Sequence, residues 1–269
     1  MSGFSSEWLA LREPHDTRAR NAGVLGAVRS YFSDAASLNV VDLGCGTGST
    51  LRAVSPHLSA SQRWRLIDND PDLLARACEL AAQQKLDATA IQLDLNRDPA
   101  DILDGSIDLV TTSALLDLVS ADWLARLARY IAQRKIPFYA ALTYDGLIEL
   151  SPPDAFDAEI VAAMNAHQHT DKGFGPALGP SAADVAIRQF EACGCTVMHG
   201  RSDWEIGPTE RRMQAEVLAG WAVAALQMKP EKNAEIENWL MRRRAAIDEG
   251  TASMRIGHVD FFAAPMRTR

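Results

Sequence analysis

The fold is decided by the stretch Val40-Val41-Asp42-Leu43-Gly44-Cys45-Gly46-Thr47-Gly48. A short apolar run ends in an acid at Asp42, and three glycines at alternate positions then lead into a helical pattern over 49–58. This order predicts a strand, a glycine loop and a helix. Because glycine tolerates positive φ and lets a ligand approach the backbone, and because a helix N-terminus offers free N–H groups, we expect a ligand at this loop.

The same unit recurs along the first half of the chain. Apolar runs predict strands at 37–42, 64–67, 88–93, 107–112 and 138–143, and helical spacing follows at 49–58, 72–83 and 123–131. Beyond residue 180 the patterns predict helices at 182–193, 209–228 and 231–247 and strands at 196–206 and 257–264. We therefore predict an α/β fold with a doubly wound, mostly parallel seven-stranded sheet and a C-terminal antiparallel ribbon.

A length of 269 residues fits one α/β domain that carries an insertion. The segment 151–180, which follows the fifth strand, holds four prolines and three glycines around one short helix at 155–166, and is predicted to be a helical and loop insertion that acts as a lid. We divide the single domain into an N-terminal helical cap (1–36), a ligand-binding core (37–150), this lid (151–180) and a C-terminal part of the sheet with helical elements on the substrate side (181–269).

Composition excludes several classes of function. The net charge of −8 disfavours nucleic acid as a partner, since the field of the protein repels a phosphate backbone. No apolar run is long enough for a membrane span and the N-terminus lacks the form of a signal peptide, so a cytoplasmic protein is expected. The four cysteines and the histidines show no spacing typical of a metal site, and no metal is expected.

Two acids and the glycine spacing narrow the ligand. A dinucleotide site reads G-x-G-x-x-G, whereas here the third glycine comes one residue early, which weakens a phosphate site. Asp42 at the end of the first strand repels a pyrophosphate and attracts an ammonium group. Asp68 ends the second strand, where an acid accepts hydrogen bonds from both hydroxyls of a ribose. A nucleoside that carries an amino acid satisfies both acids.

At this point the sequence resembles the class I S-adenosylmethionine (SAM)-dependent methyltransferases. The stretch 40–48 resembles their first motif, and Leu66-Ile67-Asp68-Asn69-Asp70-Pro71, Leu93-Asp94-Leu95 and Ile107-Asp108-Leu109-Val110 resemble later motifs in the same order. The resemblance implies a SAM-dependent methyltransferase that acts on a small soluble molecule. It further implies a set of SAM-binding residues: Gly44, Cys45 and Gly46 at the methionine part, Asp42 near its ammonium, Asp68 at the ribose, Asn69, Asp94 and Leu95 at the adenine, and Ser113 beside the sulfonium and acceptor.

Two other functions stay open. A SAM-binding protein without turnover shares the motifs and differs only in lacking an acceptor reaction. An NAD(P)-binding oxidoreductase has a related sheet, and the glycine spacing speaks against it.

Residues on the acceptor side are less well defined. His167 and His169 stand next to an acid in the predicted lid, and we expect one of them to act as a general base. Arg18 and Arg20 are candidates for binding a carboxylate of the substrate or SAM, and Trp204 is a candidate wall of the acceptor pocket. The helix at 209–228 is amphipathic, so it suits a cover of the pocket, a core element or the face of a homodimer.

Overall fold

The structure is a computed structural model that describes residues 4–266. Its centre is one eight-stranded sheet in the order β3-β2-β1-β4-β5-β8-β6, with a short β7 paired to β8. The strands β1 to β5 pair in parallel, whereas β8 is antiparallel to β5, β6 and β7. Their bounds are β1 Ser37–Leu43, β2 Ser61–Asp68, β3 Ala88–Gln92, β4 Leu109–Ser113, β5 Phe138–Ser151, β6 Cys195–Arg201, β7 Trp204–Ile206 and β8 Ser253–Pro265.

Helices connect these strands and begin where the sequence supplies caps. Asp70 accepts hydrogen bonds from the backbone N–H groups of Asp72 and Leu73 at the start of α4, and Ser120 does the same for Trp123 in α6. The α-helices are α1 Ser6–Ala19, α2 Ala22–Tyr31, α3 Ser49–Val54, α4 Pro71–Gln83, α5 Pro99–Ile102, α6 Ala121–Gln133, α7 Asp157–Gln168, α8 Ala182–Ala192, α9 Arg211–Met228 and α10 Asn233–Asp248. Short 3₁₀ turns lie at Ser55–His57, Gly179–Ser181 and Pro230–Lys232.

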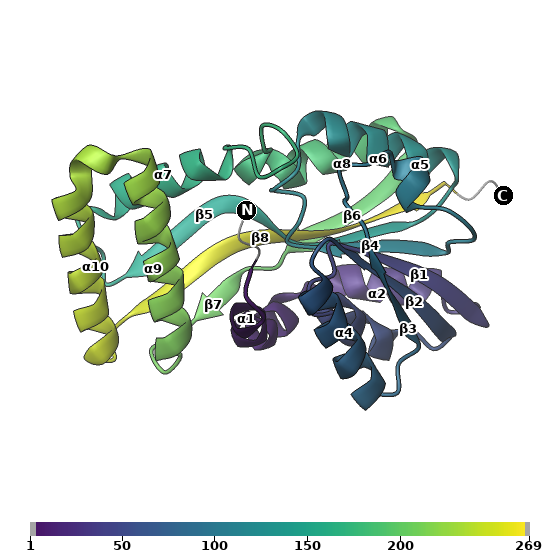
Figure 1. The fold of residues 1–269 in the computed structure, drawn as a ribbon, viewed down its shortest axis with the longest axis horizontal. Helices are drawn as coiled ribbons and strands as arrows, with labels where there is room; N and C mark the ends of the chain where they lie inside the picture. The colour runs from purple at the N-terminus through teal and green to yellow at the C-terminus, as the bar shows by residue number, and fades with distance from the viewer. Residues whose placement is uncertain (1–3, 267–269) are drawn as a thin grey trace.

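Helices cover both faces of the parallel part of the sheet (Figure 1). On one face α6 and α8 bury Trp123, Leu127 and Phe190 against the strands. On the other face α2, α3 and α4 do so with Val28 and Leu51 among others. The predicted doubly wound α/β fold is therefore confirmed, with one strand more than expected.

The extra length of β5 and β8 was not predicted. We expected strands at 138–143 and 257–264, but the two strands continue side by side through the pairs Ile148↔Ile256 and Ser151↔Ser253. The Asp145-Gly146 dipeptide is typical of a turn, yet here Gly146 adopts a φ of +89° inside a register shift of β5 and the strand goes on.

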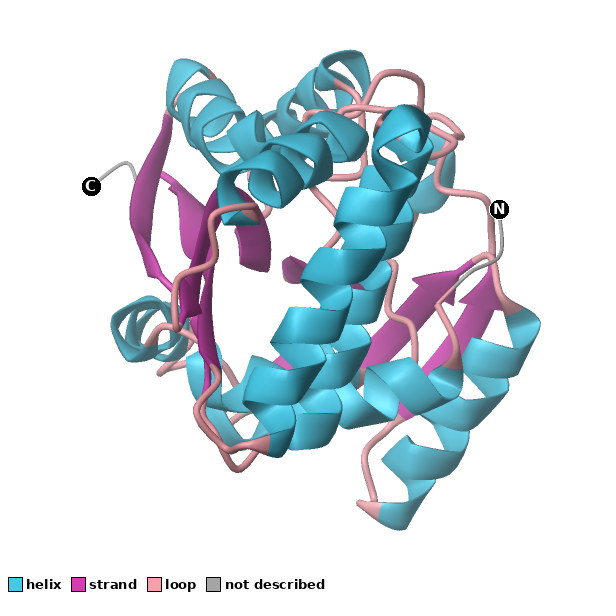
Figure 2. Cartoon of the chain, turned by 90° about the vertical axis from the view of Figure 1, so that its left-hand side faces the viewer, coloured by secondary structure: helices cyan, strands magenta, loops and turns pink. Residues whose placement is uncertain are grey.

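This extension, together with β7, α7, α9 and α10, forms a second lobe that we call the arm lobe (Figure 1). Figure 2 looks at the molecule from the side of this lobe, with its helices in front of the strands. Its core includes fully buried Trp239 and the aromatic rings of Tyr144, Trp204 and Trp221. The predicted single strand at 196–206 is wrong in one respect, because Asp203 turns its carboxylate to Arg201 and Arg255 and so separates β6 from β7.

The helix α1 joins the two lobes. Glu13 pairs with Arg52 of α3, while Asp16 accepts a hydrogen bond from Nε1 of Trp204 in the arm lobe at 2.9 Å. α1 lies between the arm lobe and the parallel strands in Figure 1. Among residues 4–266, none of the helices combines the length and the apolar character that crossing a lipid bilayer demands.

Candidate donor and acceptor site

The glycine loop has the backbone conformation that its sequence predicts. Gly44, Gly46 and Gly48 have φ values of +63°, +51° and +82°, which residues with a Cβ rarely adopt. A Cβ on Gly46 would come within 3.1 Å of Cδ1 of Leu9, so α1 packs directly over the loop. Between these glycines, the thiol of Cys45 is buried, and burial raises its pKa, so this cysteine stays neutral.

Asp42 lies beneath this loop and is completely buried. Its Oδ1 accepts a hydrogen bond from Oγ1 of Thr111 at 2.8 Å, whereas its Oδ2 has no hydrogen-bond partner. Burial raises the pKa of this carboxyl to about 7, although Thr111 and Arg20 favour the charged form. A buried carboxylate oxygen without a donor is costly, so Asp42 suits a ligand that donates a hydrogen bond or carries positive charge.

Arg20 is the site residue that the predictions underrated. It directly follows α1 and is 6% exposed, and no acid of residues 4–266 forms an ion pair with it. Its Nη2 donates to Oγ of Ser113 at 2.9 Å and its Nη1 to the hydroxyl of Tyr139 at 3.2 Å, while its buried Nε has no partner. The Tyr139 hydroxyl in turn donates to Oδ2 of Asp260 at 3.2 Å, so this acid favours the charge of Arg20 without a direct ion pair. A buried guanidinium with a free N–H suits an anionic ligand.

Ser113 links this arginine to the glycine-loop helix. Its Oγ also accepts a hydrogen bond from Oγ1 of Thr50, at 2.9 Å. Because the hydroxyl accepts from both Arg20 and Thr50, its own proton remains available to an acceptor group. Ser113 is the last residue of β4, and its role beside the sulfonium and acceptor stays a prediction.

Asp68 ends β2 and braces the loop. Its Oδ2 accepts a hydrogen bond from the Gly46 N–H at 2.8 Å and its Oδ1 from the Asp70 N–H at 3.1 Å. Each carboxylate oxygen has a further lone pair, so this arrangement leaves room for hydroxyl donors. Asn69, the next residue, is exposed, and its carbonyl oxygen accepts from Nε2 of Gln92 at 3.3 Å.

Asp94 and Leu95 follow β3. The carboxylate of Asp94 is exposed and accepts from the Asn96 N–H at 2.9 Å. Leu95 is buried, and its carbonyl oxygen accepts from Nε1 of Trp123 at 2.6 Å. Asn96 in turn donates to the Gly173 carbonyl oxygen, which ties the loop after α7 to the end of β3.

The two candidate histidines lie at the end of α7. His167 contacts Gln227 through Nε2 at 2.9 Å and Nζ of Lys172 through Nδ1 at 3.3 Å, and burial lowers its pKa. His169 is exposed, and its Nδ1 lies 3.2 Å from the Ala177 carbonyl oxygen. None of these contacts joins a histidine to the glycine loop.

Arg18 and Trp204, the other two candidates, differ in exposure. The Arg18 side chain is 56% exposed and pairs with Glu210 at 2.8 Å. Trp204 is 5% exposed, and its ring centroid lies 5.1 Å from that of His258 and 4.8 Å from the guanidinium carbon of Arg12. Trp204 is thus part of a buried cluster between α1 and the arm lobe, and Arg18 lies outside it.

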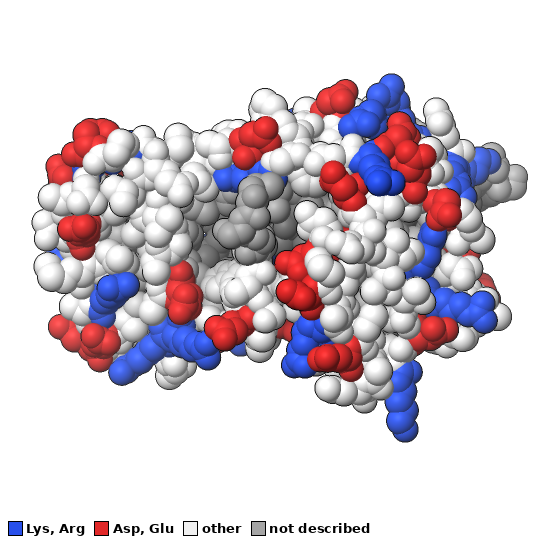
Figure 3. Space-filling view, viewed as in Figure 1, with Lys and Arg blue, Asp and Glu red and all other residues white. Residues whose placement is uncertain are grey.

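Charge is mixed over the face shown in Figure 3, where acidic and basic side chains are interspersed. Residues 4–266 contain no cluster of three or more histidines, cysteines or acids arranged to hold a metal ion.

Comparison with known proteins gives three findings. Residues 40–134 match the family model described as methyltransferase domain. No sequence among curated proteins matches the chain. Solved structures resemble its fold at low identity: the YcgJ protein of Bacillus subtilis (15% identity, TM-score 0.53, 92% of this chain and 100% of that one) and a cyclopropane synthase of Mycobacterium tuberculosis (11%, 0.52, 97% and 94%). A third is a SAM-dependent methyltransferase of Geobacter sulfurreducens, solved with S-adenosylhomocysteine (14%, 0.50, 99% and 100%).

Proposed function

We propose that this chain, a class I methyltransferase by its fold and its family match, transfers the methyl group of SAM to a small soluble molecule. One observation carries the proposal: two buried charged groups near the glycine loop have unused hydrogen-bonding atoms. Arg20 forms no direct ion pair with an acid in residues 4–266 and its Nε has no partner, and Asp42 has an oxygen without a donor. The methionine part of SAM carries a carboxylate and an ammonium group, which match these two charges.

The order of the strands supports the rest of the ligand. In the sheet, β3, β2, β1 and β4 are successive neighbours, and Asp94, Asp68, Asp42 and Ser113 lie at or just after their carboxyl ends. An extended ligand laid across these ends has its methionine part over β4 and β1, its ribose over β2 and its adenine over β3. Ligands of open α/β sheets bind at this edge.

This placement assigns roles to the other predicted residues. Asp68 accepts the ribose hydroxyls with the lone pairs that the loop does not use, and Asp94 with the Leu95 amide contacts the adenine edge beside Asn69. Gly44, Cys45 and Gly46 line the methionine part. Arg20, one of the two arginines considered for a carboxylate, and Thr50, which the sequence did not point to, complete the carboxylate end.

The chain's contribution to methyl transfer is positioning. SAM supplies a methyl carbon that is electrophilic because it is bonded to a positively charged sulfur. Arg20 and Asp42 fix the methionine part, and Leu9 of α1 excludes water from the loop. Orienting a bound pair of reactants accounts for roughly 7–11 kcal/mol in favourable cases, so this chemistry does not depend on a covalent intermediate. The catalytic role of His167 or His169 stays a prediction.

The alternatives make different demands on the site. A pyrophosphate laid over the loop would bring negative charge to Asp42, so the site disfavours NAD(P). A SAM-binding protein without turnover would have the same donor site and would lack only a reaction with an acceptor.

Three further proposals remain: that the protein is cytoplasmic, that residues 151–180 form a lid, and that α9 is a candidate dimer face. The net charge of −8 speaks against nucleic acid as a partner.

Calorimetry with SAM, S-adenosylhomocysteine, NAD and NADP tests the donor. We expect the two SAM-related ligands to bind and the nicotinamides not to bind, and tighter binding of NAD than of SAM would refute the proposal. Incubation with methyl-labelled SAM and fractionated small-metabolite extracts then identifies the acceptor. Label transferred only to protein or nucleic acid would contradict a small soluble acceptor.

A further inference from the structure

A second set of unmatched polar groups lies beyond the ends of β4 and β5. Asp117, four residues after Ser113, is 6% exposed, and its Oδ1 has no hydrogen-bond partner. The donor site does not account for this carboxylate. Burial raises the pKa of Asp117 to about 6, so at neutral pH the fold holds a largely ionised acid with one oxygen that lacks a donor.

Three other parts of the chain lie near Asp117. The Gly179 N–H donates to the Asp117 carbonyl oxygen at 2.9 Å, so the segment after α7 packs against it. Lys172 of that segment and Arg12 of α1 favour its charged form, and Asp117 in turn disfavours ionisation of the Tyr144 hydroxyl, whose pKa is raised mainly by burial. The Tyr144 ring lies 6.1 Å from the ring of His258 in β8. We call these five residues the acceptor cluster: Arg12, Asp117, Tyr144, Lys172 and His258.

Within the cluster, opposite charges are present and do not pair. Arg12 is already held by Asp16, with Nε to Oδ2 at 2.9 Å and Nη2 to Oδ1 at 3.2 Å. Lys172 donates to Oγ1 of Thr170 at 2.9 Å and contacts His167, but it forms no ion pair with any acid in residues 4–266. Asp117 and Lys172 thus attract one another, while their charged atoms remain more than a salt-bridge distance apart.

The remaining two members of the cluster, Tyr144 and His258, contribute uncharged rings. His258 is 5% exposed, its Nδ1 has no partner, and burial lowers its pKa to about 3, so it is a neutral ring at physiological pH. Tyr144 donates its hydroxyl proton to Oδ1 of Asn165 at 2.7 Å. Aromatic rings around a carboxylate are a favourable setting for an amine or ammonium group.

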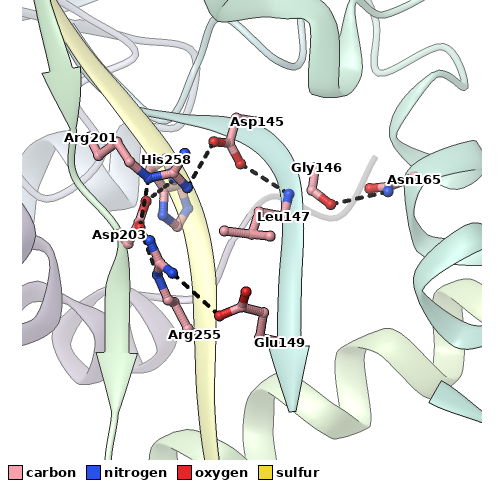
Figure 4. A network of polar contacts seen from close by, with 9 residues as sticks. All are labelled: Asp145, Gly146, Leu147, Glu149, Asn165, Arg201, Asp203, Arg255 and His258. Atoms are coloured by element: carbon pink, nitrogen blue, oxygen red, sulfur yellow. Dashed lines mark hydrogen bonds and ion pairs between the residues drawn. The ribbon is translucent and has the colours of Figure 1, made fainter. Parts of the chain in front are cut away.

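The network in Figure 4 holds His258 and the residues that follow Tyr144 in place. Asp203 accepts from the His258 backbone N–H at 3.1 Å and from Nη2 of Arg255 at 2.6 Å. Asp145 accepts from the Leu147 N–H at 3.0 Å and so holds the irregular part of β5 next to Tyr144. A Cβ at Gly257 would lie 2.1 Å from Oδ1 of Asp145, so the two strands pack here only with glycine.

The backbone is also strained where the cluster meets the donor site. Ala114 and Leu142 have φ values of +50° and +55°, although neither is glycine. Ala114 directly follows β4, and Leu142 lies at a register shift within β5. The Ala114 N–H donates to the Ala141 carbonyl oxygen, and the Leu142 N–H donates to Oδ1 of Asp260. Such strain, of order 1–3 kcal/mol per residue, is concentrated at functional sites.

We propose that the acceptor cluster is the acceptor site, and that the acceptor is a small zwitterion whose amino nitrogen is held by Asp117 and whose anionic group is held by Lys172. This inference rests on the proposed methyltransferase function. One molecule with both charges satisfies the two groups that the fold leaves apart. A simple amine leaves Lys172 unmatched, and a simple acid leaves Asp117 unmatched.

The reaction at this site balances as follows. The Asp117 carboxylate first takes one proton from the ammonium group of the bound zwitterion. The neutral amino nitrogen then uses its lone pair to form the bond to the methyl carbon, while the carbon–sulfur bond breaks and its electron pair goes to the sulfur. The proton on Asp117 leaves to solvent as the methylated ammonium product departs. Asp117 is therefore an acceptor-binding residue that also takes part in proton release.

The test compares matched acceptors with methyl-labelled SAM. Each set contains an amino acid, the amine without its carboxylate and the hydroxy acid without its amine. We expect methylation of at least one zwitterion, with a kcat/KM at least ten times that of its amine and of its hydroxy acid. Methylation of hydroxy acids or phenols in preference, or no turnover with any zwitterion, would overturn the proposal.

Two variants test which part of the acceptor Asp117 and Lys172 each bind. D117N is expected to raise the KM for the zwitterion by 10- to 100-fold, and K172Q to remove the preference for the zwitterion over its amine. The control is D122N, which replaces an acid on α6 whose side chain is 83% exposed. Calorimetry with S-adenosylhomocysteine is run on every variant. Unchanged binding with unchanged acceptor kinetics in D117N refutes the acceptor site alone, whereas absence of binding in the parent protein refutes the proposed function.

Discussion

Glu13 of α1 holds Arg52 of α3 in a two-pronged contact, with Nε to Oε1 at 2.6 Å and Nη2 to Oε2 at 2.7 Å. Arg52 also donates from Nη1 to the Thr47 carbonyl oxygen at 2.7 Å, within the glycine loop. The helix that covers the loop is thereby fastened to the loop itself. Bidentate arginine–carboxylate contacts of this kind fix geometry as well as adding energy.

From this contact we expect E13Q to weaken S-adenosylhomocysteine binding by about 3- to 10-fold, because removing the charge loosens α1 over Gly46 at a cost of roughly 1 kcal/mol. Calorimetry measures the change. The control is E7Q, a change of the same type in the first turn of α1. An identical dissociation constant for E13Q and the parent would show that α1 does not contribute to donor binding.

Arg20 and Arg18 form a matched pair for testing the carboxylate end of the donor site. R20M should weaken SAM and S-adenosylhomocysteine by about 10- to 150-fold, since a charge-assisted hydrogen bond contributes roughly 1.5–3 kcal/mol. R18M removes a side chain that is 56% exposed and should change binding less than 2- to 3-fold. Equal effects of the two substitutions would remove Arg20 from the site.

The stability of the protein without ligand should depend on the Asp117 carboxyl. Its pKa in the folded state is raised to about 6, so this group favours folding fully below its unfolded pKa of about 4 and loses that effect as the pH rises through 6. Its own backbone N–H, Arg12 and Lys172 favour its charged form but do not offset burial, and Tyr144 is a neutral neighbour. We expect D117N to raise the free energy of unfolding at pH 8, by up to about 3 kcal/mol, and to have no such effect at pH 4.

Denaturant titrations at both pH values provide the measurement. His258 has the opposite dependence, because its pKa is lowered to about 3 and its contribution is lost as the pH falls below about 6.5. His258 is unchanged in D117N, so its contribution cancels in the comparison. A variant that is less stable than the parent at pH 8 would mean that the buried carboxylate is satisfied in the fold.

Substitution of each histidine in turn distinguishes a general base from a residue that only supports the acceptor site. H167A should lower turnover, because His167 contacts Nζ of Lys172, while leaving donor affinity nearly intact. H169A tests the predicted general base directly, and loss of that base is expected to lower kcat by roughly 10²–10⁴-fold. If both variants turn over the acceptor at the parent rate, neither histidine takes part and positioning accounts for the reaction.

The donor site was largely predictable from sequence because its elements are local. Asp42, the three glycines and Asp68 lie at strand ends that the apolar pattern marks, and parallel strands bring these ends to one edge. Arg20 could not be separated from Arg18 by sequence. Both lie at the end of the same helix, and only the tertiary contacts of Arg20 with Ser113 of β4 and Tyr139 of β5 bury it while Arg18 stays exposed.

The acceptor cluster was not predictable for a different reason. Asp117 lies between apolar residues and shows no distinctive local pattern, and its neighbours Tyr144 and Lys172 are 27 and 55 positions away in the sequence. The long antiparallel pair β5–β8 brings Tyr144 next to His258, and its extension past Thr143 was hidden by a dipeptide typical of turns. Contacts at such separation depend on tertiary structure and leave no local pattern.

The contact of α1 with both lobes has a consequence for the order of events in the catalytic cycle. Leu9 of this helix covers Gly46, and Arg12 one turn later belongs to the acceptor cluster, so both proposed binding steps involve this one helix. We expect the donor to bind first, because Leu9 covers the loop that receives it, and the acceptor to bind afterwards. Product inhibition should accordingly be sequential, with S-adenosylhomocysteine competitive against SAM and noncompetitive against the acceptor, and with the methylated product departing first.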